Sequence, residues 1–388
     1  MNKILSLFNP DCETAVANGS PYYMASANIV KMAKDLALLP CWIYGQNAVV
    51  LGKDMNEYEF NMSKLFISQM SELFKEDFEF ISEKELPLWE GLFFEPWGVT
   101  PRELLCFKAC ENVREWDDDY KYMYSRNLSR DVLSYMKFPF LPKECNTLDE
   151  IILANDSMLC IAKSPWSSSG RGILQMSCPI SIKEKEWLRG VLKKQGSVML
   201  EHKFDRVYDF AMEFHIGDQE LKFIGLSEFK VGKNYEYKGN FVGNSKIIAN
   251  RLMQYVDASK VSNIIDKLEN FLIQNIVGKY TGFLGVDMFV YREGENEFNI
   301  NPCVEINLRC NMGIVANMFS RKFLHTDNNG YFYIDYFNKP KEALAFHRRN
   351  KKDNQAIFKD NHLYSGYLNL TPVDENTNFI AYVRIDSE

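Results

Sequence analysis

The chain has 388 residues, of which 45 are basic and 52 acidic, and 46% are hydrophobic. That length exceeds one ordinary hydrophobic core, so two or three globular domains are expected and a disordered chain is excluded. The net charge of −7 argues against a general nucleic-acid binder. The sequence also contains no apolar run of ~20 residues, which argues against a membrane span.

Nine cysteines are spread along the chain without a CxxC pair or a zinc-type His-Cys spacing. Their odd number and spacing predict reduced, buried thiols rather than a disulfide framework. The apolar run near the N-terminus ends at Asn9-Pro10 and is too short for a secretion signal. We therefore expect a cytoplasmic protein.

The N-terminal residues predict a parallel α/β unit. A short buried strand over 3–8, an amphipathic helix over 25–38 and two strands near 41–44 and 48–51 give the strand–helix–strand order of such units. The loop 9–23 lies at the carboxyl end of the first strand, where these sheets bind ligands. It is either an ordinary polar connector or a substrate-binding loop, whose acidic residues would indicate a cationic acceptor amine. Its candidate contacts are Asp11, Glu13, Asn18 and Tyr22.

Residues 54–125 are predicted to be rich in helices. Phe93-Phe94 is expected to form a strand, and a helix is expected to begin at Pro101 with Thr100 as its cap. Nothing in this segment indicates chemistry, so packing is its expected role.

A phosphate-binding loop is predicted after the next helix. The helix is expected over 127–136, with Ser129 as its N-cap, and a buried strand follows over 158–162. Lys163 ends that strand and begins a loop, 164–172, of hydroxyl residues and two glycines. Hydroxyl, backbone N–H and Lys groups donate to phosphate oxygens, and glycines let the backbone approach them. The loop does not match the P-loop pattern, and an ordinary Ser/Gly surface loop is the alternative.

Three strands are expected over 197–204, 208–216 and 221–229, and the second alternates between polar and apolar side chains. This pattern predicts an antiparallel meander with one polar face. Residues 235–244 are rich in Gly and Asn and predict a mobile, functional loop. An amphipathic core helix is expected over 259–277.

The strongest chemical signal is a hairpin over 283–309, in which two apolar strands flank a charged turn. A turn centred near residue 296 places Asp287 opposite Glu305. Directly opposed side chains lie about 5 Å apart, where two carboxylates repel each other unless a cation lies between them. Asn307 adds a third hard oxygen donor, so the hairpin predicts a Mg²⁺ site for a substrate phosphate. An edge hairpin with solvated carboxylates fits less well, because the acids interrupt apolar strands.

The remaining residues predict a helix over 312–323 and then a looser extension over 324–388 that ends in a strand over 378–385. A basic run at 347–352 fits a solvated face, or a surface that guides an anionic substrate. No GxSxG elbow is present, and no nucleophile–base pair can be selected.

In this order the features resemble the ATP-grasp superfamily, over roughly residues 126–323. The resemblance implies a mixed α/β and α+β protein with a parallel α/β domain, the pre-ATP-grasp domain, at 1–125. A small ATP-grasp lobe with the phosphate loop would follow at 126–195, a large lobe with the metal site at 196–330, and a C-terminal extension at 331–388. The implied cofactors are ATP and Mg²⁺, or Mn²⁺ in its place.

The resemblance also implies which residues hold the metal and act in catalysis. Asp287, Glu305 and Asn307 resemble the family's metal ligands. Arg309 resembles its arginine near the acyl phosphate, and Lys163 resembles a catalytic phosphate-binding cation.

The nucleotide site is implied by the same resemblance. Arg130 resembles a second phosphate-binding cation, and the segment 201–204 resembles the hinge that contacts adenine and ribose. Asp209 stands where family members commonly carry Glu. The full set expected to bind ATP is Arg130, Lys163, Ser167, Ser168, Ser169, Gly170, Gly172, Glu201, His202, Lys203, Phe204 and Asp209.

The implied activity is an ATP-dependent ligase that joins a carboxylate to an amine through an acyl phosphate. A kinase-like phosphotransferase, or a nucleotide-binding protein without turnover, is the alternative. The expected partners are small-molecule acids and amines, with no nucleic acid and no membrane, and dimers are common in the family. Because acyl phosphates hydrolyse easily, a closing loop is needed, for which 164–172 and 235–244 are candidates.

Overall fold

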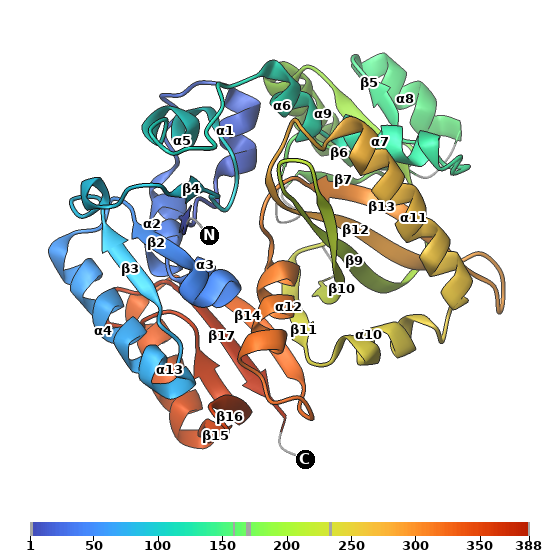
Figure 1. Cartoon of the computed structure of the whole chain (residues 1–388). Helices are drawn as coiled ribbons and strands as arrows, with labels where there is room; N and C mark the ends of the chain where they lie inside the picture. Colours follow the sequence, from blue (N-terminus) through green and yellow to red (C-terminus); the bar gives the residue numbers. More distant parts are fainter. Residues whose placement is uncertain (1–2, 158–159, 168–171, 233–234, 387–388) are drawn as a thin grey trace.

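The computed structural model describes residues 3–157, 160–167, 172–232 and 235–386. Its strands form a four-stranded parallel sheet, a four-stranded antiparallel sheet and a nine-stranded antiparallel sheet. Figure 1 shows the parallel sheet in blue near the red C-terminal strands, while the green antiparallel sheet lies at the other end of the molecule. Sequence reasoning therefore predicted the mixed fold class correctly.

The N-terminal unit is the parallel sheet, of strand order β3-β2-β1-β4, as expected from its strand–helix–strand pattern. The strand expected at 41–44 is wrong, because these residues lie in helix α3. Pro40 in its first turn favours helical φ, and every side chain of α3 is buried, so no polar stripe marks the helix. The elements are β1 (Ile4–Ser6), α1 (Cys12–Asn18), α2 (Ala27–Asp35), α3 (Leu39–Tyr44), β2 (Ala48–Gly52), α4 (Glu57–Phe74), β3 (Glu79–Ser82), β4 (Phe93–Phe94), α5 (Pro101–Cys106) and α6 (Asp118–Met123).

The second unit is the small antiparallel sheet, of order β5-β8-β6-β7. Ser125, rather than the expected Ser129, caps the helix before it by accepting the backbone N–H of Asn127. The Ser129 hydroxyl instead accepts the backbone N–H of Ile306 at 3.2 Å, which packs α7 on β13. The elements are α7 (Arg126–Tyr135), β5 (Lys143–Cys145), α8 (Leu148–Ser157), β6 (Cys160–Lys163), β7 (Ile173–Gln175), α9 (Ile182–Gln195) and β8 (Val198–His202).

The third unit is the nine-stranded sheet, of order β13-β12-β9-β10-β11-β14-β17-β16-β15. It contains the expected meander and hairpin, with α12 packed against it. The elements are β9 (Arg206–Ile216), β10 (Leu221–Val231), β11 (Tyr237–Val242), α10 (Ser245–Leu252), α11 (Ala258–Asn275), β12 (Gly282–Arg292), β13 (Phe298–Asn307), α12 (Met312–Lys322), β14 (Gly330–Tyr336), α13 (Pro340–Asp353), β15 (Ile357–Lys359), β16 (His362–Asn369) and β17 (Phe379–Ile385).

Two expectations for this unit are wrong. Most of the segment 235–244 is strand β11 rather than a loop. Gly239 is required there because a Cβ would lie 2.7 Å from the carbonyl oxygen of Phe332 on the next strand. The C-terminal residues are not loose, because β14 to β17 continue the sheet. Apolar side chains cover both faces of β14, with Phe332 packed among α3 and α12 and Tyr333 packed toward α13, so no polar alternation reveals the strand.

Among the described residues, no helix has both the length and the apolar character needed to cross a membrane. Cys106 and Cys178 are exposed, so the expectation of buried thiols is wrong at these two positions. Cys106 ends the short helix α5, and Cys178 precedes Pro179 in an exposed turn.

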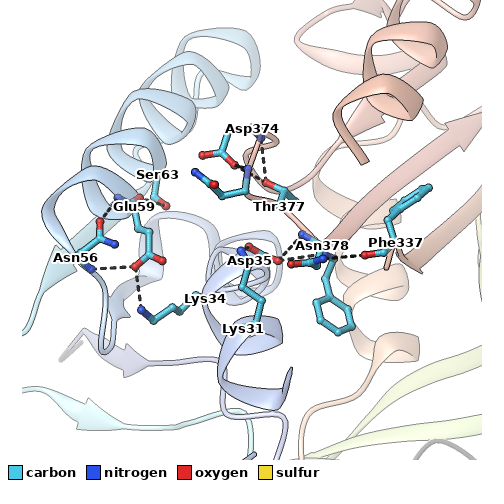
Figure 2. A network of polar contacts seen from close by, with 12 residues as sticks. Lys31, Lys34, Asp35, Asn56, Glu59, Ser63, Phe337, Asp374, Thr377 and Asn378 are labelled. Carbon is cyan, nitrogen blue, oxygen red and sulfur yellow. Dashed lines mark hydrogen bonds and ion pairs between the residues drawn. The ribbon is translucent and has the colours of Figure 1, made fainter. Parts of the chain in front are cut away.

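Asp35, at the end of α2, joins the N-terminal unit to the C-terminal strands (Figure 2). Its Oδ2 accepts the backbone N–H groups of Asn378 at 2.9 Å and Phe379 at 3.0 Å, and Lys31 donates to Oδ1. The carboxylate is buried, and this burial raises the pKa of Asp35. The contact therefore fixes the start of β17 against α2.

Asp35→Ala should lower the free energy of unfolding by about 2–4 kcal/mol, because the buried N–H group of Phe379 and the half-buried N–H group of Asn378 would lose their acceptor. Urea unfolding followed by circular dichroism measures this loss. Asp266→Ala, at an exposed position of α11, is the control and should stay within about 0.5 kcal/mol of the wild type. Equal stability of the two variants would show that Asp35 does not join the units.

Candidate active site

A cavity of about 400 Å³ crosses the nine-stranded sheet from Glu305 on β13 to Phe379 on β17. Strands β6 and β8 of the small sheet line its other side. The cavity thus lies between the second and third units, with contributions from the first. Its charged and amide-bearing lining residues include Arg126, Lys163, Glu201, Arg206, Glu213, Asp287, Glu305, Asn307, Arg309 and Asn311.

The hairpin places its polar residues as the sequence predicts. Asp287 on β12 is in register with Glu305 on β13, and Gly285 is in register with Asn307. Burial, and then the negative charge of Glu305, raise the pKa of Asp287 to about 8. Burial also raises the pKa of Glu305, against the opposing effect of Arg126. The pairing is confirmed, and the metal-binding role of these residues stays a prediction.

Arg126, rather than the expected Arg130, is the α7 cation that lines this cavity. Its Nη2 lies 2.9 Å from Oε1 of Glu305, and its Nε donates to the carbonyl oxygen of Ser164 at 3.1 Å. Its side chain is only 4% exposed, and its Nη1 has no hydrogen-bond partner within the described ranges. A buried guanidinium with a spare donor suits an anionic oxygen atom.

Arg130 lies one helical turn further along α7 and does not line the cavity. It pairs with Glu144 at 3.7 Å, and about a third of its side chain is exposed. The two arginines occupy similar positions in the helical pattern, so sequence spacing alone could not choose between them.

Lys163 and Glu201 form a buried ion pair, with Nζ and Oε2 2.5 Å apart. Lys163 ends β6, and Glu201 lies on the neighbouring strand β8. Burial lowers the pKa of Lys163, although the negative charge of Glu201 opposes this shift. The pair holds a lysine inside the cavity, and the phosphate-binding role expected for Lys163 stays a prediction.

The hinge predicted to bind adenine and ribose lines the cavity in part. Glu201, His202 and Phe204 line it, whereas Lys203 projects toward Gln175, to which it donates at 3.3 Å. A largely apolar slot surrounds these residues, formed by Ile161, Ile173, Phe204, Met288 and Val304. Such a slot fits a flat, mostly apolar ring.

The other expected nucleotide contacts lie elsewhere or outside the described residues. Asp209 pairs with Arg206, and it is Arg206 that lines the cavity, with its guanidinium 4.5 Å from the ring centre of Phe289. Ser167 accepts a hydrogen bond from Arg126 at 3.3 Å, and the carbonyl oxygen of Gly172 accepts from Ser164. Neither Ser167 nor Gly172 lines the cavity. Ser168, Ser169 and Gly170 lie outside the described residues.

A buried carboxylate that sequence reasoning did not select lies beside the metal-type residues. Glu213 on β9 accepts from Ser227 at 2.7 Å and from Asn311 at 2.8 Å, and burial raises its pKa to about 7. A Cβ on Gly285 would lie 2.4 Å from Oε2 of Glu213, so the glycine makes room for this group. The alternation of β9 predicted that Glu213 and His215 share a polar face. Nothing in the sequence indicated which of the two belongs to the site.

The N-terminal unit reaches the cavity through an ion pair with Arg309. Nε of Arg309 lies 2.6 Å from Oε1 of Glu13, and its Nη2 donates to Oδ1 of Asn307 at 3.0 Å. Of the other loop candidates, Asp11 lines a separate small cavity and Tyr22 is 82% exposed. Asn18 lines neither cavity in the described part of the chain.

The residues present fit a divalent metal held together with phosphate. Within the described ranges, no group of three or more His, Cys, Asp and Glu side chains could hold a metal by itself. Asp287 and Glu305 offer two carboxylates, and Asn307 offers an amide oxygen with a second lone pair beside its bond to Arg309. Mg²⁺ commonly takes one or two carboxylates and completes its shell with water and phosphate oxygens.

The acidic pair is expected to make the stability of the fold depend on pH and on Mg²⁺. The folded-state pKa of Asp287, about 8, lies above its ordinary value of 3.8, so the wild type loses stability as the pH rises between these values. The side chain of Asp287→Asn stays neutral at every pH. Without metal, the variant should therefore melt at a higher temperature than the wild type, and this difference should grow to several degrees between about pH 5 and 8.5. At pH 8, MgCl₂ should stabilise the wild type but not this variant.

Differential scanning fluorimetry measures both effects, and Asp266→Asn, on exposed α11, is the matched control. An equal response of the wild type and Asp287→Asn to MgCl₂ would remove Asp287 from the metal site.

No family model and no curated protein matches the sequence. Among solved structures, the chain is similar to an N5-carboxyaminoimidazole synthetase from Staphylococcus aureus complexed with ADP. The TM-score is 0.52 and the sequence identity 12%, and the match covers 100% of this chain and 95% of that chain. A biotin carboxylase beta-gamma-ATP complex from Campylobacter jejuni is similar with a TM-score of 0.54 and 10% identity, over 100% and 88% of the two chains. Both are ATP-grasp proteins. The chain therefore has the ATP-grasp fold.

Proposed function

We propose that the protein is an ATP-dependent ligase that joins a carboxylate to an amine through an acyl phosphate and releases ADP and phosphate. One observation carries the proposal: the cations Lys163, Arg126 and Arg309 line the same cavity as the acids Asp287 and Glu305. Burying so many charges together costs desolvation energy, which a bound polyphosphate and metal would offset. The likeness in fold to two nucleotide-bound structures supports ATP as the phosphate source.

Each part of the cavity has a role in this proposal. The apolar slot around Ile161 and Phe204 would hold the adenine ring, while Lys163 and Arg126 would neutralise phosphate oxygens. Asp287, Glu305 and Asn307 would hold Mg²⁺, which neutralises the charge that develops on the phosphate oxygens during transfer. The protein thus aligns its substrates and balances charge rather than supplying a nucleophile.

The atoms balance over two steps. A carboxylate oxygen of the acid attacks the γ-phosphorus, the bond to the bridging oxygen breaks, and ADP leaves. The amine nitrogen then attacks the acyl carbon, phosphate leaves with the electrons of the C–O bond, and the nitrogen loses a proton. Arg309, held by Glu13 and Asn307, lies where it could stabilise the negative charge of the acyl phosphate.

The proposal predicts that Mg-ATP gives ADP and free phosphate only when an acid and an amine are both present. A panel of acid–amine pairs, with both products quantified, measures this requirement. ADP formation with phosphate retained on an acceptor would instead show a phosphotransferase. ATP binding without ADP formation under any mixture would show a nucleotide-binding protein without turnover.

Glu305→Gln should lower turnover of the active pair about a hundredfold or more, because it removes a charge that holds the metal at the transferring phosphate. Steady-state phosphate release measures the loss. Asp266→Asn, at an exposed site on α11, should keep wild-type turnover. Turnover of Glu305→Gln within about threefold of the wild type would contradict the assigned metal role.

The two arginines of α7 provide a matched test of the phosphate site. Arg126→Lys keeps a positive charge beside Glu305 but loses the fork of donors, so the affinity for Mg-ATP should fall about tenfold or more. Arg130→Lys should change it by less than about twofold, because Arg130 lies outside the cavity. Isothermal titration with a non-hydrolysable ATP analogue measures both. A larger loss of affinity for Arg130→Lys than for Arg126→Lys would support Arg130 as the phosphate-binding cation.

A further inference from the structure

The cavity is divided into two chemically different parts. The part formed by α7, β6, β8, β9, β12 and the end of β13 holds the charged residues described above. The other part, which we call the apolar end, is formed by β10, β14, β17 and α2. Its apolar side chains are Met32, Phe229, Val231, Ile334, Tyr336 and Phe379, and Glu236, Tyr237 and Asn240, on or beside β11, also line it. The proposed nucleotide and metal contacts account for the charged part and leave the apolar end without a ligand.

Polar groups at the apolar end are already engaged by the protein. The Tyr237 hydroxyl donates to Oδ1 of Asn240 at 2.7 Å, and Nδ2 of Asn240 donates to the carbonyl oxygen of Glu228 at 3.3 Å. Glu236 pairs with Lys238 at 3.1 Å, with both side chains about half exposed. A polar or charged ligand group would therefore have to displace an existing contact, whereas an apolar group would not.

The backbone holds the apolar end in place. Tyr336 on β14 is in register with Phe379 on β17, and the backbone N–H of Phe379 is bound by Asp35 of α2. The same helix contributes Met32 to the lining. This wall is thus built by packed strands and a clamped helix, and it can select a ligand by shape and polarity.

We infer that the carboxylate substrate carries an uncharged, apolar acyl chain or side chain, which binds at the apolar end of the cavity. This inference rests on the proposed function and specifies its substrate. The reacting carboxyl group lies toward Arg309, and the apolar group extends across β10 toward Tyr336 and Phe379. Acids with a charged far end should bind less tightly, because their charge would give up water at an end whose buried polar group, Asn240, already has its partners.

Straight-chain acids with different far ends test the inference. The probes are hexanoate, adipate and 6-aminohexanoate, together with decanoate, sebacate and 10-aminodecanoate, titrated by calorimetry into protein loaded with Mg²⁺ and a non-hydrolysable ATP analogue. Hexanoate and decanoate should bind at least about tenfold more tightly than their charged counterparts. The affinity should rise up to about fourfold for each added methylene that becomes buried. Equal binding of apolar and charged acids, or no binding of any of them, would overturn the inference.

A matched pair of variants locates the binding site. Tyr336 and Ile357 are both 52% exposed and lie in the same sheet, but only Tyr336 lines the cavity. Tyr336→Asp should weaken decanoate binding at least about tenfold and strengthen 10-aminodecanoate binding, because it places a carboxylate at the apolar end. Ile357→Asp should leave both affinities within about twofold. Equal effects of the two variants would show that the apolar group of the acid binds elsewhere, and would overturn its placement at the apolar end.

Phosphate release separates this inference from the proposed function. Phosphate release that requires an acid and an amine but shows no preference for apolar acids would support the ligase function and overturn the inference about the acid. Preferential binding of apolar acids, with no phosphate release for any amine, would support binding at the apolar end and contradict the ligase function.

Discussion

The structure depends on two carboxylates that face each other across adjacent antiparallel strands. Asp287 and Glu305 are in register inside a cavity. Burial raises the pKa of both groups, and the negative charge of Glu305 raises the pKa of Asp287 further. Such a pair opposes folding unless positive charge surrounds it. Arg126, at 2.9 Å from Glu305, supplies part of that charge, and a divalent cation would supply the rest. Without a bound cation, the pair therefore lowers the stability of the fold.

Each unit of the chain contributes charged side chains to this site. The small sheet contributes Lys163, already paired with Glu201, and the helix before it contributes Arg126. The N-terminal unit contributes Glu13, which holds Arg309 beside Asn307. Charges from distant parts of the sequence thus converge on one hairpin. This convergence favours an anionic ligand over a purely structural role for the hairpin.

The sequence predicted the hairpin well, because strand alternation and the symmetry of the turn determine which side chains face each other. It also indicated Lys163, because the lysine lies between a buried strand and a glycine-containing loop, although an ordinary surface loop fitted the same composition. It could not choose between Arg126 and Arg130, because one helical turn separates them and only the packing of α7 on β13 selects one. It also missed α3, in which every side chain is buried, and β14, which carries apolar side chains on both faces. Neither element shows the polar alternation that identifies helices and strands.

The clamp made by Asp35 has a consequence for how ligands enter. The N-terminal unit is held to the C-terminal strands at Asn378 and Phe379 and to the hairpin region at Arg309. The small sheet, by contrast, has its own hydrophobic core around Ala162, Leu188 and Leu200. A hinge opens most readily where few packed contacts must be broken. A unit with its own core can move as a body without exposing that core, whereas movement of the wall at Phe379 would break its hydrogen bond to Asp35.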